Sequence, residues 1–185
     1  MERSLAAALA LVVAAPALAR SVSGKEFPES VEVGGSKLVL NGAGVRRKLF
    51  LKIYVGGLYL PSPSSDAAGI VAADAPKRVR LVFLRNVSRD DLKKAYRVGI
   101  ERNSPGAQVD ALVAKLDDLA AALPGVLPEG SELAVTYVPG EGTTIVTGDG
   151  VRATVPGKDF ADAMFRTWLG DRPADGSLKD AMLGR

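Results

Sequence analysis

Alternation between apolar and polar residues predicts that the first half of the chain is built from short strands. Residues 30–33 and 37–41 flank the turn-forming segment Gly34-Gly35-Ser36 and predict a β-hairpin. A later run, residues 78–84, alternates in the same way and predicts a further strand.

The longest strand signal begins at Leu49, where every odd position up to Val55 is apolar. Alternation with a period of two predicts a strand that buries this row on one face and carries Tyr54 on the opposite face. Two glycines within the strand, Gly56 and Gly57, predict a bulge or a kink, because glycine weakens a strand unless the backbone bends or is closely approached.

Helical spacing replaces alternation after residue 88. Ser88, with Asp91 three residues later, predicts an N-cap and a helix that runs to about Asn103. The stripe of this helix that includes Tyr96 is less uniformly apolar than core packing requires. Apolar residues then recur at helical spacing over residues 109–123, which predicts a second and purely structural helix.

The rest of the chain predicts strands over residues 132–138, 143–147 and 151–155, then helices from Lys158 and over residues 177–183. Strands and helices therefore come in separate groups, and hairpin-type links join the strands. This order predicts an α+β fold in which helices cover one face of a large antiparallel sheet.

Residues 1–19 are typical of a signal peptide, with Arg3 near the start, a short apolar run and the small-residue box Ala17-Leu18-Ala19. We expect cleavage near Ala19, a single domain over residues 20–185 and a periplasmic or secreted location. A membrane anchor is the alternative, but Pro16 interrupts the apolar run, which is shorter than the roughly 20 residues that cross a bilayer. We therefore expect no transmembrane segment after cleavage.

The composition excludes several kinds of active site. The 185 residues include no cysteine and no histidine, which excludes cysteine proteases, Ser-His-Asp triads and histidine-based zinc hydrolases. The net charge of +3 is small and scattered, so we expect no nucleic-acid partner. Gly42-Ala43-Gly44 is expected to form a turn, but it lacks the third glycine or the lysine of a nucleotide-binding loop, and a strand follows it. We expect no cofactor and no bound metal.

Two stretches give the sequence a recognisable family resemblance. LNGAGVR, followed by KLFLKIYVGGLYLP, and the ending FRTWLGDRPADGSLKDAMLG resemble the chalcone isomerase-like family over residues 31–183. The resemblance implies an open-faced β-sandwich, with a ligand cleft between the sheet and its helices. Some members close the flavanone ring of chalcones, using an arginine together with threonine, tyrosine and asparagine side chains. Other members bind fatty acids without catalysis, through an arginine and a tyrosine at the carboxylate.

Only some of the family's functional residues have a suitable counterpart in this sequence. Arg46 matches the arginine of the family motif, and Tyr54 falls where the isomerases have their threonine. Asp91 and Val98 fall near the isomerases' tyrosine and asparagine, but valine cannot hydrogen-bond and an aspartate would repel a phenolate. The resemblance therefore implies ligand binding through Arg46 and Tyr54, with Tyr96 as a weaker lining residue, and no catalytic residue.

Three hypotheses remain open at this stage. The leading one is an exported protein that binds a small amphipathic anion, such as a fatty acid, without turnover. The second is an intramolecular lyase or isomerase that acts on a chalcone-like phenolic or enone substrate. The third is a structural protein whose cleft is filled by its own side chains. Because consecutive strand residues point to opposite faces, Arg46 is expected to face the cleft and Arg47 the solvent.

Overall fold

The computed structural model of the chain describes residues 19–150 and 152–185. The expected signal peptide therefore lies outside the described residues, except for Ala19 at its end. None of the helices in the described part combines the length and the apolar character that a membrane crossing requires.

A seven-stranded sheet, antiparallel at every pairing, forms the centre of the described structure. Its spatial order is β11-β10-β9-β6-β5-β4-β3. These strands are β3 (Ser30–Val33), β4 (Ser36–Lys48), β5 (Leu51–Leu60), β6 (Lys77–Phe83), β9 (Glu132–Val138), β10 (Gly142–Thr147) and β11 (Arg152–Val155). Two small ribbons accompany the sheet, one formed by β1 (Ala19–Val22) with β2 (Lys25–Pro28) and one by β7 (Val87–Ser88) with β8 (Val126–Leu127).

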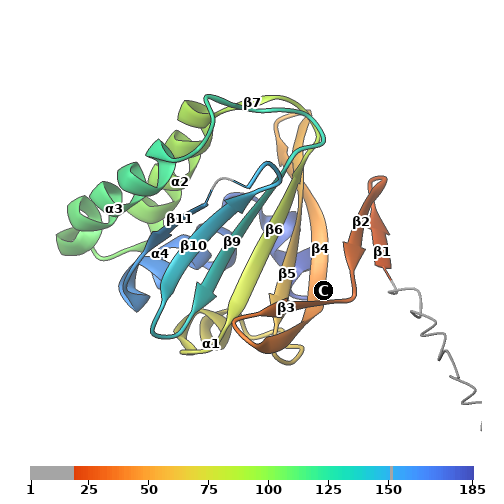
Figure 1. Cartoon of the computed structure of the whole chain (residues 1–185), viewed down its shortest axis with the longest axis horizontal. Helices are drawn as coiled ribbons and strands as arrows, with labels where there is room; N and C mark the ends of the chain where they lie inside the picture. The colour runs from red at the N-terminus through yellow and green to blue at the C-terminus, as the bar shows by residue number, and fades with distance from the viewer. Residues whose placement is uncertain (1–18, 151) are drawn as a thin grey trace, which may run out of the picture.

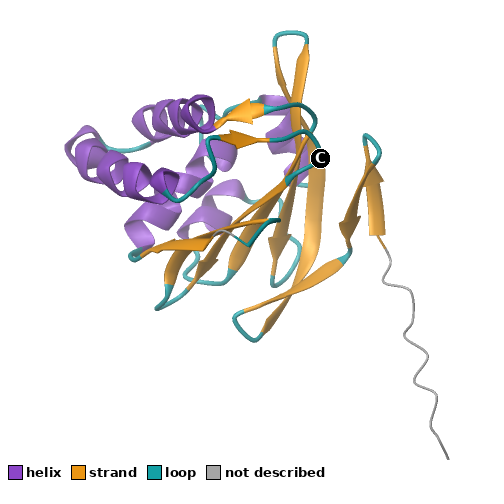
Figure 2. Cartoon of the chain, turned by 45° about the horizontal axis from the view of Figure 1, so that its top comes forward, coloured by secondary structure: helices purple, strands orange, loops and turns teal. Residues whose placement is uncertain are grey.

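The helices gather on one side of the large sheet, as Figures 1 and 2 show. They are α1 (Ala67–Ala72), α2 (Arg89–Asn103), α3 (Val109–Ala121), α4 (Lys158–Leu169) and α5 (Gly176–Met182), with a 3₁₀ turn, η1 (Gly106–Gln108), between α2 and α3. Ser88 caps α2 as the sequence predicts, because its hydroxyl accepts the Asp91 N–H at 3.0 Å. The predicted α+β architecture is confirmed. The β1–β2 ribbon and α1 are additions that the hydrophobic pattern did not predict.

Apolar side chains are buried on both faces of the sheet. The larger core lies between the sheet and the helices and contains Tyr54, Tyr96 and Trp168. A smaller core lies on the other face, where Phe27 from β2 packs with a cluster that includes Val55. The β1–β2 ribbon therefore covers part of the face that the helices leave open.

The glycines of β4 serve close packing rather than a turn, which corrects the sequence interpretation. Residues 36–48 form one continuous strand, and the turn comes later, at residues 49–50. A side chain at Gly42 would collide with the carbonyl oxygen of Ala181, and one at Gly44 would collide with the Ala181 methyl group. Helix α5 can therefore approach β4 only because both positions lack a Cβ atom.

The bulges of this hairpin also differ from the prediction. Gly56 and Gly57 pair regularly with β4, whereas the register shifts where Asn41 and Ile53 are the extra residues. A side chain at Gly56 would meet Met182, and one at Gly57 would meet Phe27, so these glycines admit neighbours on the two faces of the sheet.

The expected buried row from Leu49 to Val55 is wrong for two physical reasons. The hairpin tip extends past the helices, so Leu49 is 86% exposed and Leu51 is 52% exposed. The bulge at Ile53 then shifts the alternation, because one extra residue reverses which face the following side chains occupy. As a result Tyr54 enters the larger core and Val55 the smaller one.

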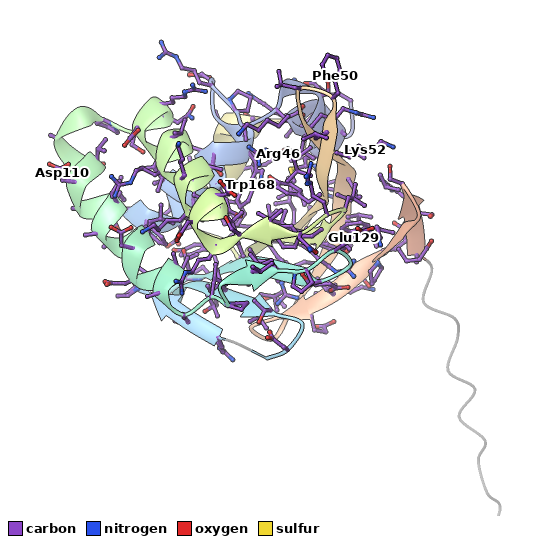
Figure 3. All side chains as sticks on the ribbon, turned by 90° about the horizontal axis from the view of Figure 1, so that it is seen from above. Arg46, Phe50, Lys52, Asp110, Glu129 and Trp168 are labelled. Carbon is purple, nitrogen blue, oxygen red and sulfur yellow. The ribbon has the colours of Figure 1, made fainter. Side chains whose placement is uncertain are left out.

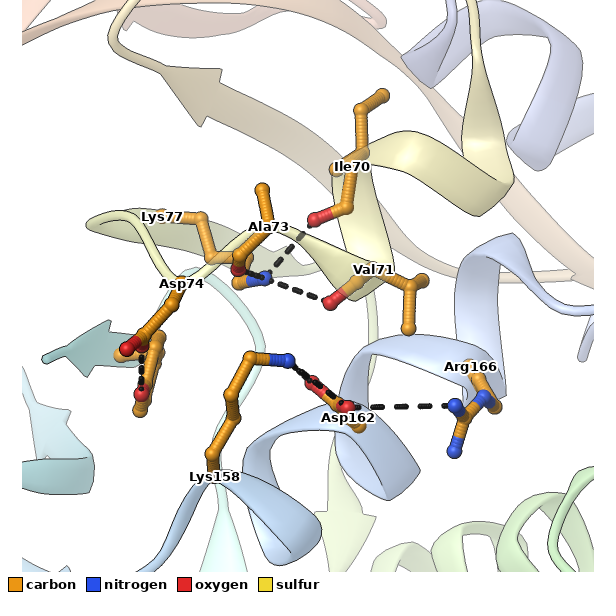
Figure 4. Close-up of polar contacts among 9 residues, drawn as sticks. Ile70, Val71, Ala73, Asp74, Lys77, Lys158, Asp162 and Arg166 are labelled. Atoms are coloured by element: carbon orange, nitrogen blue, oxygen red, sulfur yellow. Dashed lines mark hydrogen bonds and ion pairs between the residues drawn. The ribbon is translucent and has the colours of Figure 1, made fainter.

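A buried lysine closes the end of α1 (Figure 4). The Lys77 ammonium donates to the carbonyl oxygens of Ile70, Val71 and Ala73 at 2.8, 2.9 and 2.8 Å. These carbonyls lie at the helix end, where they have no intrahelical donor and where positive charge is favourable. Burial lowers the pKa of Lys77 to about 8. Lys77 is 1% exposed, and these three hydrogen bonds offset the free-energy cost of burying its amino group.

We predict that Gly42→Ala destabilises the protein by about 1 to 3 kcal/mol, the usual range for overpacking, because the new methyl group would push α5 away from β4. Urea denaturation measures the change in the free energy of unfolding. Gly125→Ala is the matched control, since a Cβ atom there meets nothing within 4 Å. Equal stability of the two variants would contradict the packing role of Gly42.

Candidate functional site

The pairing of β4 with β5 brings two of the predicted site residues together. Arg46 lies directly opposite Tyr54 in the antiparallel register, so both side chains project to the same face. The Arg46 guanidinium carbon lies 5.5 Å from the centre of the Tyr54 ring, within range of a cation–π contact. Arg46 is half-buried, and its Nε is fully buried without an acceptor among the described residues.

Arg47 behaves differently, as the sequence predicts. It is exposed, and its backbone N–H donates to the Asp175 carboxylate at 2.7 Å. Asp175 also accepts the N–H of Leu178 and so caps α5. This contact fixes the start of α5 against the end of β4.

Tyr54 connects the sheet to the helices. Its hydroxyl accepts a hydrogen bond from the Trp168 indole N–H at 3.0 Å, and the side chain is 2% exposed. Burial raises the pKa of Tyr54, while the Arg46 charge and the Trp168 hydrogen bond oppose that rise. The phenol therefore stays neutral, and its own proton remains available to an acceptor.

Tyr96 projects from α2 into the same part of the larger core as Tyr54 and Trp168. Its ring packs edge-to-face against Trp168, with 5.5 Å between ring centres. Its hydroxyl is buried and has no hydrogen-bond partner in the described part of the chain. Burial and then the neighbouring Tyr54 raise the pKa of Tyr96 well above its ordinary value, against the effect of Arg46. Tyr96 is therefore a neutral donor with no acceptor.

The three side chains line a very small inner cavity. Its volume is about 10 Å³, which is about the space of one water molecule. The lining comprises Arg46, Tyr54, Leu92, Ala95, Tyr96, Thr167, Trp168 and Ala174. The structure thus brings together all three residues predicted from the sequence. Trp168, which the sequence interpretation missed, lines the same cavity, and Figure 3 shows it in the interior on the side of Arg46.

A larger cleft opens on the other side of Arg46. It has a volume of about 470 Å³, within the range of small-molecule sites. Its lining comprises Arg46, Lys48, Leu51, Ile53, Arg85, Asn86, Val87, Asp91, Leu92, Lys94, Ala95 and Val98. Because Arg46, Leu92 and Ala95 line both spaces, the inner cavity adjoins the cleft.

The charges around the cleft favour an anion. Arg46, Lys48, Arg85 and Lys94 face a single carboxylate, Asp91, and a cleft with charges mostly of one sign concentrates ligands of the opposite sign. Asp91 itself accepts a hydrogen bond from the Ser88 hydroxyl at 2.7 Å, which holds it at the start of α2. Among the described residues, no group of three or more acidic side chains is close enough to hold a metal ion.

A second depression, of about 870 Å³, lies near α1 and the ends of α2 and α4 and contains none of the predicted site residues. Three of its five basic side chains are already engaged, and two acidic residues, Asp66 and Asp171, also line it. Arg166 pairs with Asp162, while Lys179 and Arg185 donate to backbone carbonyls. The cleft beside Arg46 is therefore the better candidate for anion binding.

The fold and the cleft together define an α+β protein with a basic, ligand-sized site between a sheet and a helix. The chain belongs to the chalcone isomerase-like family, whose sequence model matches residues 19–184. This confirms the family predicted from the sequence motifs. Among curated proteins, no sequence matches the chain.

The fold is similar to the crystal structure of a fatty-acid binding protein from Arabidopsis thaliana. The TM-score is 0.73, with 90% of this chain and 96% of that chain covered. The sequences are 16% identical, so the similarity establishes the shared fold.

All four tyrosines of the chain, Tyr54, Tyr59, Tyr96 and Tyr137, have pKa values raised above 10.0, with burial as the first cause. We predict that the native protein shows less tyrosinate absorbance at pH 10 than the unfolded chain, whose tyrosines are about half ionised there. Above this pH the unfolded chain loses protons that the native state retains, so the free energy of unfolding falls as pH rises. A native titration with a midpoint near 10 would reveal a solvated phenol and contradict this account.

Proposed function

We propose that the protein binds a small amphipathic anion, such as a fatty acid, without chemical turnover, in the cleft between the β4–β5 hairpin and α2. The observation that carries this proposal is the buried Nε of Arg46, which has no acceptor in the described structure and lies where the cleft meets the inner cavity. A buried polar group without a partner is destabilising, so each one in a native structure calls for an explanation, and at the edge of a cleft a ligand with an acceptor supplies one.

The head group is proposed to bind Arg46, because a guanidinium can hold a carboxylate through two parallel hydrogen bonds. The hydroxyls of Tyr54 and Tyr96 lie behind Arg46, in a cavity too small for a carboxylate. We therefore propose a secondary contribution for these hydroxyls, since they would reach the anion only after a side chain of the inner cavity turned.

The apolar tail is proposed to follow the hydrophobic part of the cleft lining. Leu51 and Ile53 supply the hairpin side, and Leu92 and Val98 supply the helix side. The inner core cannot take the tail, because Trp168 is 1% exposed and packs directly against the sheet residue Tyr54. The hypothesis of a cleft filled by the protein's own side chains therefore describes the inner cavity and not the outer cleft.

One cleft residue argues against an isomerase. Val98 lines the cleft near the position where the isomerases have an asparagine, and valine has no hydrogen-bonding group. Asp91 also lines the cleft, but it would raise the free energy of a bound phenolate and of a bound carboxylate alike, so it does not separate the two hypotheses. The similarity in fold to a protein described as fatty-acid binding supports the binding hypothesis instead.

Calorimetric titration with dodecanoate tests the site. We predict that Arg46→Ala weakens binding by about 1.5 to 3 kcal/mol, or roughly 10- to 150-fold, because a charge-assisted contact is lost from a partly desolvated place. Arg46→Lys keeps the positive charge but loses the paired N–H donors of the guanidinium, so its affinity for dodecanoate should lie between those of Arg46→Ala and the wild type. Arg47→Ala is the matched control on the neighbouring position and should change affinity by less than about threefold.

Tyr96→Phe separates a binding role from a structural one. The hydroxyl has no partner in the described structure, so its removal should leave stability unchanged or slightly higher, yet weaken dodecanoate binding by about 0.5 to 1.5 kcal/mol. Tyr54→Phe should weaken binding by a similar amount and also destabilise the fold, because the Trp168 N–H loses its acceptor. Wild-type affinity in Arg46→Ala, or turnover of a chalcone panel, would contradict the proposal.

We also propose that the protein acts after export. The signal-like character of residues 1–19 supports this. The intact mass of the material recovered from cells should then correspond to a chain that begins near Arg20. Recovery of the full-length chain from the membrane fraction would contradict export by cleavage.

A further inference from the structure

The tip of the β4–β5 hairpin carries three large apolar side chains in solvent. Leu49 is 86% exposed, Phe50 is 98% exposed and Leu51 is 52% exposed. Figure 3 shows Phe50 at the edge of the molecule, with Arg46 farther in, on the side of Trp168. A cluster of this kind on an otherwise well-packed domain marks an interaction surface.

The backbone of the tip makes this choice of residues more informative. Leu49 and Phe50 form a two-residue loop between the paired residues Lys48 and Leu51, and Leu49 has a φ of +55°. Glycine and asparagine are favoured at such positions, because a leucine is strained there. The sequence thus places two bulky apolar residues where neither burial nor turn geometry calls for them.

The flanks of the tip are entirely basic. Arg47, Lys48 and Lys52 are exposed, and no acidic residue occurs from position 33 to position 65. Across the described ranges, none of these three side chains takes part in a salt bridge. The Asp175 carboxylate nearby accepts the backbone N–H of Arg47 and the N–H of Leu178.

The tip is continuous with the mouth of the cleft. Lys48 and Leu51 belong to both, and Ile53 continues the apolar surface from Leu51 toward Arg46. Arg85 and Lys94 extend the basic character along the rest of the cleft lining. A surface that bound the tip would therefore lie against the cleft entrance.

We propose that the β4–β5 tip docks on an anionic lipid membrane, where Leu49 and Phe50 enter the boundary of the acyl chains and Arg47, Lys48 and Lys52 bind the head-group phosphates. This is the chemistry of a peripheral membrane anchor, which combines a small apolar wedge with flanking cations. A protein partner fits less well, since a two-residue tip is far smaller than the roughly 800 Å² per partner of a stable protein interface.

Docking would place the cleft mouth at the membrane surface, so that an amphipathic anion passes between the bilayer and the cleft. This last consequence rests on the proposed function. The docking itself does not, because the four residues whose substitution tests it, Leu49, Phe50, Arg47 and Lys52, lie outside the cleft lining.

The test is co-sedimentation of the mature protein with vesicles of phosphatidylcholine, alone or with about a third of phosphatidylglycerol. We expect partitioning onto the anionic vesicles that weakens as salt rises. Leu49→Gly with Phe50→Ser should lower it by at least about tenfold, through loss of the apolar wedge. Glycine also suits the backbone at position 49, so this variant should remain folded.

The charged flank has its own variant. Arg47→Gln with Lys52→Gln should lower partitioning onto anionic vesicles by roughly 25-fold, about fivefold per cation, and leave binding to phosphatidylcholine unchanged. Lys48 is left intact because it lines the cleft. The matched controls are Val126→Ser, at another exposed apolar residue, and Lys37→Gln, at an exposed lysine elsewhere on β4. Both should behave as wild type.

Phe50→Trp reports the contact directly. Its emission should shift to the blue on addition of anionic vesicles, whereas the wild type, whose one tryptophan is buried, should not change. Absence of wild-type partitioning, or equal partitioning of the Leu49→Gly/Phe50→Ser variant, would overturn the proposal. So would a concentration-dependent dimer in sedimentation velocity that this variant abolishes, because the tip would then be a contact between copies.

The outcomes distinguish this proposal from the proposed function. Dodecanoate affinity in vesicle-free buffer should be unchanged in Leu49→Gly/Phe50→Ser, and Arg46→Ala should partition within about twofold of wild type. If the wild type binds vesicles but not dodecanoate, the proposed fatty-acid ligand is refuted and membrane docking is established. Dodecanoate binding without vesicle binding would refute docking alone.

Discussion

Arg46 and Tyr54 face each other because β4 and β5 pair antiparallel in a register that a bulge at Ile53 interrupts. This register decides most of what the site is. On the inner side of the bulge, Tyr54 points into the larger core and accepts the Trp168 hydrogen bond. On the outer side, the hairpin continues past the helices and exposes its apolar tip. Without the bulge, Tyr54 would lie on the opposite face of the sheet relative to the residues of the tip and would not point into the larger core.

Helix α5 depends on the same hairpin. Gly42 and Gly44 allow the Ala181 turn to lie directly on β4, and Asp175 fixes the start of the helix to the backbone of Arg47. Ala174, just before that helix, completes the wall of the inner cavity. The glycines that resemble a phosphate-binding turn in the sequence therefore act by bringing the C-terminal helix against the strand that carries Arg46.

The polar groups at the site illustrate a balance between stability and binding. Trp168 and Tyr54 satisfy one another, whereas the Arg46 Nε and the Tyr96 hydroxyl have no partner in the described structure. Each buried group of this kind lowers the stability of the ligand-free protein. An anion that accepted from Arg46 would recover part of that free energy, so the arrangement favours a ligand with an acceptor head group. The raised pKa values of both tyrosines keep the phenols neutral, which avoids a second negative charge beside the anion.

Local signals were sufficient for much of the fold. The Ser88 cap, the helical spacing of residues 109–123 and the strands after residue 132 depend on interactions within a few residues, so the sequence predicts them well. Alternation along the strand also predicts that Arg46 and Arg47 lie on opposite sides, with Arg47 exposed. The β1–β2 ribbon could not be found in this way, because its burial depends on Phe27 packing against distant strands.

The sequence by itself determined most of the elements, the family and the residue types available to the site, because propensity, capping and periodicity are local properties. Only the tertiary structure decided which set of side chains on each strand faces the core. The bulge at Ile53 and the contact of α5 with Gly42 arise from pairings between segments far apart in the chain. Trp168 could not be identified from spacing for the same reason, since 114 residues separate it from Tyr54. A one-residue shift in a strand reverses its faces, so the division between core, cleft and exposed tip was fixed only when the long-range register was fixed.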